Sequence, residues 1–270
     1  MTNKEDFRKI ADDPQFVEGI YNYCDRWCER CRFRLRCANY SISEQQLLQD
    51  GPEADADGSF WENVNEMFEV TVDMIREIAE EKGIDLDHVS PETYEEQRRI
   101  FDEKSEAYSC THAASDYIEM VEEWFRSADH LLEGKEDELS MKAEILEFDD
   151  SDPSGEADEI DNAIEVIRWY QPQIYVKCMR AVQGLSEPDD NPQEASQYDA
   201  DGSAKVALIE IDRSIASWGV LYRYFSQTEN EIIDILVHLD RLRKNVEMTF
   251  PHAREFIRPG FDEEQYQEAV

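Results

Sequence analysis

Positive charge is scarce in this chain of 270 residues. Lysine and arginine together number 27 against 64 aspartate and glutamate residues, which gives a formal net charge of −37. A field of this sign repels phosphate, so nucleic acid and anionic membrane surfaces are disfavoured as partners. Lysine is scarcer than arginine, at 9 residues against 18. Because high salt screens the repulsion between carboxylates, a halophilic source is our hypothesis for this charge, and a merely acidic mesophile is the alternative.

Long apolar runs are also missing. No stretch approaches the roughly 20 apolar residues that a membrane-spanning helix needs. The opening MTNKEDFRKIADD lacks the apolar core of a signal peptide. We therefore expect a cytoplasmic protein that does not span a membrane. Cysteines stay reduced in that compartment, so a tight cysteine cluster indicates metal binding before it indicates disulfides.

Strand-like alternation is nearly absent, and apolar residues recur instead at helical spacing. Helices are predicted over residues 60–82, about 91–132, about 159–182, 204–225 and 229–247, with a short final helix from residue 251. Residues 139–148 are ambiguous. The sequence therefore predicts an all-α fold, a bundle of four to five long helices with an N-terminal cysteine-rich metal-binding loop.

Single residues are expected to delimit these helices. Gly83 and Gly134 are predicted to end the first two. Ser59 and Ser203, each closing a DADGS string, are predicted to be N-caps. Pro172 is expected to kink the third long helix.

The predicted organisation has two parts. Residues 1–48 form an N-terminal segment with the four-cysteine loop, and residues 60–258 form the bundle. Acidic stretches containing glycine and proline near 149–158 and 184–202 are expected to be loops.

Four of the six cysteines lie within fourteen residues, in the segment CDRWCERCRFRLRC, with the spacing C-x3-C-x2-C-x5-C. The predicted ligands are Cys24, Cys28, Cys31 and Cys37. Four thiolates in one short loop can converge on a [4Fe–4S] cluster. Zinc is the alternative metal, although structural zinc sites usually join two knuckles across a longer spacer. Four reduced cysteines without metal are the third interpretation.

Arginines flank these cysteines, at positions 26, 30, 32, 34 and 36. They could offset the negative charge of a thiolate cluster and donate hydrogen bonds to sulfur. Alternatively they form a patch that docks a partner, either an acidic redox protein or a nucleic-acid phosphate, or they pair with the protein's own carboxylates. Trp27 and Phe33 are expected to anchor the loop to the bundle and to exclude water.

The C-x2-C-x5-C part resembles the iron–sulfur loops of endonuclease-III-like glycosylases and of some CRISPR-associated nucleases, over ten residues. The chain lacks a helix-hairpin-helix signature and a nuclease carboxylate motif, so those activities are not carried over. The first three cysteines also match radical S-adenosylmethionine enzymes. There an aromatic residue usually stands where this chain has Arg30, and Cys37 could close the iron site that those enzymes keep open.

A wider resemblance rests on YNYCDRWCERC together with the later strings IRWYQPQIY, IDRSIASWG and HLDRLRK. These are similar to motifs of an uncharacterised bacterial family of helical proteins. That family has no assigned activity. The resemblance therefore implies a helical fold, and it implies that the cysteines of the motif belong together. It implies no reaction.

Other constellations carry less chemistry. No histidine stands in a Glu-x-x-His pair, which disfavours a di-iron oxidase. Asp240 and Lys244 are spaced for an ion pair along one helix. Cys110 and Cys178 stand alone and are expected to be small buried side chains. Four polar residues could converge on a pocket in the bundle, although ion pairs and solvated faces are the plainer interpretation: Glu165, Asp212, His112 and His238.

The sequence thus predicts an iron–sulfur protein for electron transfer or redox sensing, with a redox partner protein near the arginine-rich cysteine loop. The alternative is a helical interaction module in which zinc or a cluster is a structural clip. An enzyme with an unrecognised site in the bundle is a third interpretation, and the oligomeric state is left open.

Overall fold

A computed structural model describes residues 13–50, 72–73, 75–77, 79–81, 83, 99, 108–145, 153–186 and 193–263. The chain divides into two compact units, one of Met1–Ile100 with Ile257–Val270 and the other of Phe101–Phe256. Over the described residues the regular elements are α-helices and 3-10 turns without any strand, so the all-α prediction is confirmed. The predicted boundary between residues 48 and 60 stays a prediction, because residues 51–71 lie outside the description.

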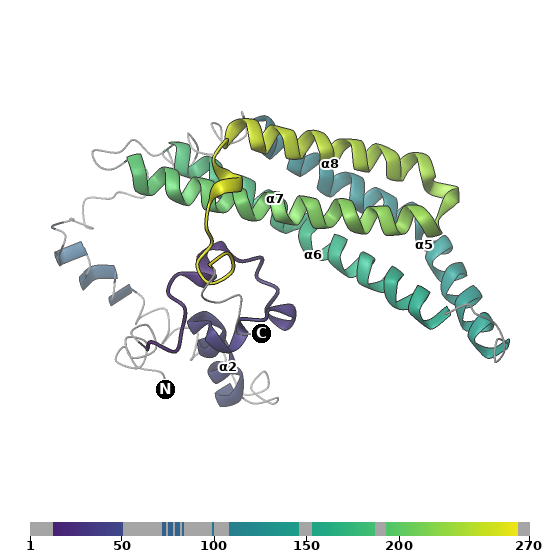
Figure 1. Cartoon of the computed structure of the whole chain (residues 1–270), viewed down its shortest axis with the longest axis horizontal. Coiled ribbons are helices and arrows are strands. Elements are labelled where there is room, and N and C mark those ends of the chain that lie inside the picture. The colour runs from purple at the N-terminus through teal and green to yellow at the C-terminus, as the bar shows by residue number, and fades with distance from the viewer. Residues whose placement is uncertain are drawn as a thin grey trace. The chain divides into compact units, whose positions relative to one another are not determined.

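Four long helices build the second unit: α5 (Ser109–Ile145), α6 (Pro153–Ser186), α7 (Gln193–Tyr224) and α8 (Glu229–Thr249). Consecutive helices run antiparallel, and α8 packs back against α5 to close the circuit (Figure 1). A 3-10 turn, η6 (Ser226–Thr228), links α7 to α8. None of the helices in the described ranges carries a segment long and apolar enough to cross a membrane. The predicted bundle of long helices is present in this unit.

Apolar periodicity explains why these segments form a bundle. The buried residues of α8 recur at spacings of three and four, which places them on one face of the helix. All five are at most 2% exposed: Ile232, Ile235, Leu239, Leu242 and Val246. The helix α7 is buried over a wider arc because α6, α8 and η7 (Ala253–Glu255) all contact it.

An aromatic cluster fills the space between α5 and α7. Trp124 and Trp218 meet edge to face, with ring centroids 5.0 Å apart. Trp218 also donates its indole N–H to the hydroxyl oxygen of Tyr117 at 3.0 Å. Burial raises the pKa of Tyr117 to about 12, although hydrogen bonds with Trp218 and Ser214 act in the opposite direction. The cluster therefore combines apolar burial with one hydrogen-bonded pair, Trp218 and Tyr117, whereas the indole nitrogen of Trp124 is buried without a hydrogen-bond partner among the described residues.

The predicted end of a helix at Gly134 is wrong, because α5 continues to Ile145. A glycine inside a helix costs only about 1 kcal/mol. Beyond it, Leu139 is 4% exposed, and Lys135 and Lys142 both pair with Glu138 at 3.0 and 2.6 Å. Continued burial and these pairs outweigh the cost of the glycine.

The predicted N-cap at Ser203 is also wrong, because α7 already begins at Gln193. Ser203 lies inside the helix and is 1% exposed, between the fully buried Ala200 and Ala204. The acidic stretch 184–202 is accordingly helical from residue 193 onward. Burial of small apolar residues against α6 stabilises the helix here, although the acidic residues around them are typical of a loop.

The other acidic stretch, 149–158, is helical from residue 153, because α6 begins there and not near residue 159. Pro153 occupies the first helical position, where its missing N–H costs nothing. Glu156 in the first turn complements the helix dipole. Pro172 lies inside α6 without ending the helix.

Gly83 ends a helical segment as predicted. Its φ of 69° is left-handed, and its N–H donates to the carbonyl oxygen of Glu80 at 3.1 Å. The described residues of the predicted helix 60–82 are helical, at 72–73, 75–77 and 79–81. The predicted N-cap Ser59 lies outside the described residues.

Candidate metal centre

Three short 3-10 turns position the four predicted ligands in the first unit: η1 (Ile20–Tyr23), η2 (Cys28–Arg30) and η3 (Arg34–Arg36). Cys24 and Cys37 directly follow η1 and η3, whereas Cys28 is the first residue of η2 and Cys31 directly follows that turn. The N–H of Cys31 donates to the carbonyl oxygen of Cys28 at 3.1 Å. Helix α2 (Ala38–Asp50) begins immediately after Cys37. These backbone turns therefore fix the position of each cysteine's main chain, from which its thiol extends.

The four thiols border the same small cavity, whose free volume is about 20 Å³. All four cysteines are reduced and half-buried. The structure therefore brings together the four predicted ligands around one space. Further side chains complete the wall: Ile20, Tyr21, Asp25, Arg26, Trp27, Arg34, Tyr40 and Phe261.

The four sulfurs are not arranged as the ligands of a bound metal. No group of three His, Cys, Asp or Glu side chains within the described ranges is spaced to hold a metal ion. A single zinc ion, with Zn–S bonds of about 2.3 Å, would therefore require the sulfurs to rearrange. The cavity has room for roughly one water-sized atom, so a cubane with its four irons would require it to widen. The donor set fits a thiolate-bound metal, whereas the spacing of the sulfurs matches neither geometry as it stands.

The thiols influence one another electrostatically. Burial raises the pKa of Cys28, and the nearby Cys24, Cys37 and Cys31 raise it further. Burial likewise raises the pKa of Cys31, with smaller contributions from Asp25 and from other cysteines of the loop, while a hydrogen bond from the backbone of Phe33 lowers it. Thiolates at these positions would repel each other, and a cation between them would reverse that repulsion.

The turn between Cys24 and Cys28 has an unusual backbone. Arg26 has a φ of 59°, which makes it the one non-glycine residue with left-handed geometry in the described part of the chain. Its carbonyl oxygen accepts a hydrogen bond from the N–H of Cys28 at 3.0 Å. Asp25 accepts one from the N–H of Trp27 at 3.2 Å. Such a conformation is unfavourable for a residue with a Cβ, so the surrounding contacts must hold it.

A C-terminal segment completes the wall of the cavity, and no sequence pattern near the cysteines indicates this contribution. The ring of Phe261 packs edge to face on Phe33, with centroids 5.1 Å apart. The carbonyl oxygen of Phe261 accepts a hydrogen bond from Arg32 at 3.4 Å. Gly260 has a φ of 75°, and a Cβ there would lie 2.9 Å from Ile20. The Pro259-Gly260 turn before an aromatic residue was the available signal.

Aromatic rings and arginines cover the loop. Trp27 and Phe33 are 5% and 4% exposed, so their predicted burial is confirmed. The guanidinium of Arg30 lies 4.1 Å from the ring centroid of Trp27, and that of Arg32 lies 4.7 Å from that of Phe33. These arginines stack on the loop's own rings, an arrangement that the charge pattern did not indicate. Anchoring of the loop to the bundle stays a prediction.

The four polar residues proposed for a bundle pocket do not come together. His112 and Glu165 are exposed. Asp212 pairs with Arg254 at 2.7 Å. His238 places Nε2 2.7 Å from the carbonyl oxygen of Ala113. The interpretation as ion pairs and solvated faces therefore fits better. The predicted ion pair within α8 is confirmed, with Lys244 Nζ 2.6 Å from Asp240 Oδ2.

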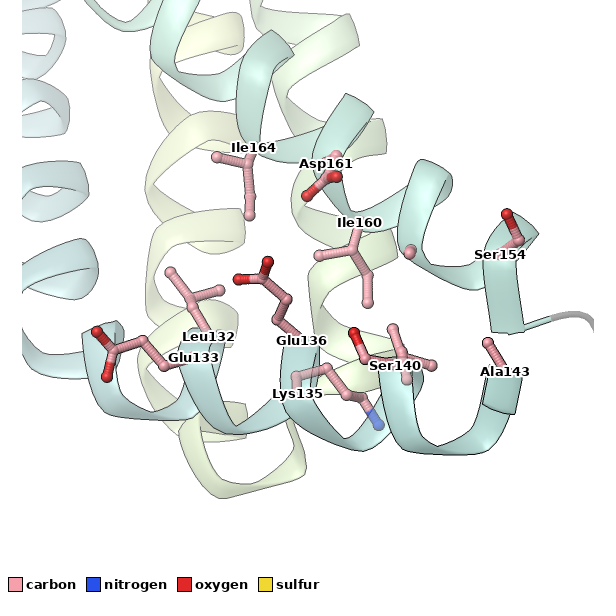
Figure 2. Close-up of a pocket in the computed structure, with 12 residues that line it drawn as sticks. Leu132, Glu133, Lys135, Glu136, Ser140, Ala143, Ser154, Ile160, Asp161 and Ile164 are labelled. Carbon is pink, nitrogen blue, oxygen red and sulfur yellow. The ribbon is translucent and has the colours of Figure 1, made fainter. Parts of the chain in front are cut away.

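A groove of about 490 Å³ does open between the end of α5 and the start of α6, lined by other residues. Figure 2 shows Glu136 reaching from α5 toward α6, where Ile160 and Ile164 point back toward α5. Carboxylates, serines, one lysine and aliphatic side chains make up its described lining. Among these lining residues there is no histidine or cysteine to pair with a carboxylate, so the groove offers no recognisable catalytic arrangement.

Comparisons with protein-family models, with curated proteins and with solved structures find no match to this chain. Its class therefore rests on its own structure: an all-α protein in which four long helices form a bundle and four N-terminal cysteines surround one cavity.

Proposed function

We propose that the N-terminal cysteine loop binds a [4Fe–4S] cluster that transfers single electrons or senses oxidants. The observation that carries this proposal is that Cys24, Cys28, Cys31 and Cys37 all border one cavity. Four thiolates are the usual ligand set of such a cluster. In this proposal the loop supplies the ligands, and the turns η1 to η3 hold them in register.

The electrostatics of the loop support a bound metal of some kind. Burial and neighbouring groups raise the pKa of Cys28 and of Cys31, so thiolates at these two positions need a cation to stabilise them. Metal ions stabilise the deprotonated thiol. Arg26 and Arg34 line the same cavity and would offset the remaining negative charge of a tetrathiolate centre.

The spacing of the ligands favours iron–sulfur over zinc. All four cysteines fall within fourteen residues, whereas structural zinc usually joins two knuckles that are further apart. In a cubane each of the four thiolates binds a different iron, so four cysteines of one short loop can supply all of its protein ligands.

The surface around the loop supports docking of a redox partner. Leu35 is 74% exposed between Arg34 and Arg36, in a chain whose net charge is −37. A basic patch with an exposed apolar side chain fits an acidic partner protein, because opposite charges steer the encounter. We propose a cytoplasmic setting, since a reduced cysteine loop of this kind persists there.

A structural clip is the second candidate, and a specific observation favours it. The buried apolar cluster described in this unit consists of only Val17, Ile20 and Phe33, with Cys31, Cys37 and Phe261 packed against it. Metal binding can contribute on the order of 10 kcal/mol to the folding of a small domain. The metal, zinc or cluster, would then hold the N-terminal segment folded while the surface binds another macromolecule.

A reductive titration of oxygen-free full-length protein tests the first proposal. We expect brown protein whose visible absorption bleaches on reduction and returns on reoxidation. Cys28→Ser should abolish this signal, whereas the matched control Cys178→Ser, on a buried bundle cysteine, should retain it. A colourless protein with about one zinc per chain would replace the redox proposal with the clip. A cluster that cannot be reduced reversibly would also favour the clip.

A further inference from the structure

The end of the bundle at which α5 leads into α6 is built from two helices, whereas the rest has four. The hydroxyl of Tyr224, the last residue of α7, donates to Glu159 of α6 at 2.7 Å, and α8 begins just beyond η6. Of the described helices, only α5 and α6 continue past this level (Figure 1). Their apolar faces lose the cover that α7 and α8 give them elsewhere, and the groove of about 490 Å³ opens between them.

Aliphatic side chains form the floor of this groove. Leu139 of α5 and Ile160 of α6 are 4% and 5% exposed, and Leu132 and Ile164 are half-buried beside them. Ala157 contributes only a methyl group, which leaves space above the floor. A hydrocarbon placed here would remove apolar surface from water on both sides of the contact, and that burial is favourable.

Carboxylates stand over this floor without a cation of their own. Figure 2 shows Glu136 of α5 and Asp161 of α6 in the gap between the two helices. Neither carboxylate makes a hydrogen bond or an ion pair with another residue in the described ranges. Lys135 is the single cation of the described lining, and its ammonium lies 3.0 Å from Glu138 and is turned away from the gap (Figure 2). The groove therefore combines an apolar floor with uncompensated negative charge.

The dimensions of the groove favour a small molecule over a protein. Pockets for small organic ligands typically enclose about 300–1,000 Å³. A stable protein interface uses about 20–30 residues from each side, whereas twelve line this groove. A second copy of the chain would bring the same carboxylates against Glu136 and Asp161, so like-charge repulsion disfavours it. A fatty acid would meet the same repulsion, which leaves a cation with an apolar body as the complementary ligand.

We propose that the groove between α5 and α6 binds an aliphatic amine, a protonated amino group on a hydrocarbon chain of medium length. The hydrocarbon lies on Leu139 and Ile160, and the ammonium donates hydrogen bonds to Glu136 and Asp161. An ammonium has three N–H donors and no acceptor, so carboxylates from two walls match its bonding capacity. The proposal is independent of the metal centre, because every residue of the lining belongs to the bundle unit.

Calorimetric titration of full-length protein with n-octylammonium tests the proposal. We expect saturable binding of one molecule per chain. Ethylammonium lacks most of the hydrocarbon and octanol lacks the charge, so each should bind at least tenfold more weakly. Octanoate should not bind detectably. The proposal is wrong if octylammonium shows no saturable binding at millimolar concentration, or if octanol binds as tightly.

Methyl NMR of the same complex locates the ligand. Octylammonium should shift the methyl signals of Leu139, Ile160 and Ile164, and it should leave those of Ile232 and Ile235 on α8 unchanged. Shifts confined to residues outside the groove would overturn the proposal. This map uses wild-type protein, so its result does not depend on how any variant folds.

A pair of charge-matched double variants separates the groove from general attraction to an acidic protein. Glu136→Gln with Asp161→Asn removes two exposed carboxylates from the groove, and Glu231→Gln with Asp234→Asn removes two exposed carboxylates from α8. The first should weaken octylammonium binding at least tenfold, and the second should change it less than twofold. Equal weakening by both would mean that net charge alone attracts the amine, and the proposal would fail.

Ala157→Phe tests the space itself, because it fills the groove and leaves every charge in place. Binding of octylammonium should be lost, with far-ultraviolet circular dichroism as the check on folding. If this variant unfolds, the methyl map and the charge-matched variants still decide. A dimer that Ala157→Phe dissociates would assign the groove to a second copy. Tighter binding of a basic amphipathic helical peptide, also lost in this variant, would assign the groove to a protein. Either result would overturn the proposal.

Discussion

The two units of the chain rely on different sources of order. The bundle buries apolar faces from four long helices, including large side chains such as Trp218, Tyr117 and Tyr170 at under 2% exposure. The described part of the cysteine unit has three short turns, the helix α2 and a small buried cluster of Val17, Ile20 and Phe33, and Tyr23 and Trp27 are also buried there. We therefore expect the bundle to fold without metal and the cysteine loop to depend on it. The following predictions test this contrast from the largest effect to the smallest.

Removing the metal should have the largest effect, and it should be confined to one unit. Cys28→Ser is expected to cost the cysteine unit on the order of 10 kcal/mol, because metal-binding energy there is folding energy. Hydrogen exchange should show loss of protection around Ile20 and Phe33, with α5 to α8 unchanged. Equal protection in the variant and the wild type would contradict the account, and so would loss of protection throughout the bundle.

Trp218→Ala should have the opposite distribution. Loss of a buried aromatic side chain costs about 3–5 kcal/mol, and here it also leaves the hydroxyl of Tyr117 without its indole donor. Denaturant unfolding followed by far-ultraviolet circular dichroism measures this cost, and metal content should stay at the wild-type level. Met248→Ala, at a side chain of α8 that is 73% exposed, serves as the control and should change stability by at most about 0.5 kcal/mol.

Two glycine-to-alanine changes should act with opposite signs. Gly260→Ala puts a Cβ 2.9 Å from Ile20 and 3.2 Å from Val17 at a φ of 75°, so we expect a loss of about 1–3 kcal/mol in the cysteine unit and weaker metal retention. Gly219→Ala, inside α7 with open space around the new methyl, should stabilise the bundle by about 0.5–1 kcal/mol. Competition with a chelator and thermal melting measure the two effects. Equal metal retention in both variants would contradict the prediction that Gly260 is needed for the structure of the metal site.

The smallest effect is expected at the surface of the bundle. Arg254 pairs with Asp212 at 2.7 Å and with Glu247 at 2.9 Å, and its side chain is 41% exposed. Arg254→Ala should cost under about 1 kcal/mol, because exposed pairs are screened by water and salt. Chemical denaturation at low and at molar salt should show the cost shrinking as salt rises. A salt-independent loss of several kcal/mol would mean that this network, and not the apolar core, stabilises η7 on the bundle.

Local signals in the sequence predicted what is local in the structure. The helix predicted over 229–247 matches α8 (Glu229–Thr249), because its apolar face repeats without interruption. The start of α7 was missed because its first turns are acidic and resemble a loop, while their buried alanines become informative only once α6 is in place. The long continuation of α5 was missed because Gly134 looks like a helix end in isolation.

The candidate site divides in the same way. Cys24 to Cys37 were recognised because the four thiols are close in sequence, and the structure brings them to one cavity. The contribution of Gly260 and Phe261 was missed because they join the loop from the other end of the chain. Contacts between distant segments depend on the fold, and no periodicity or spacing encodes them.

The central claim is tested most directly by counting metal in freshly prepared, oxygen-protected full-length protein. The account predicts about four iron and four acid-labile sulfide per chain, with both lost in Cys28→Ser. Protein that contains neither iron nor zinc in stoichiometric amount, or a serine variant that keeps the same metal content as wild type, would contradict it.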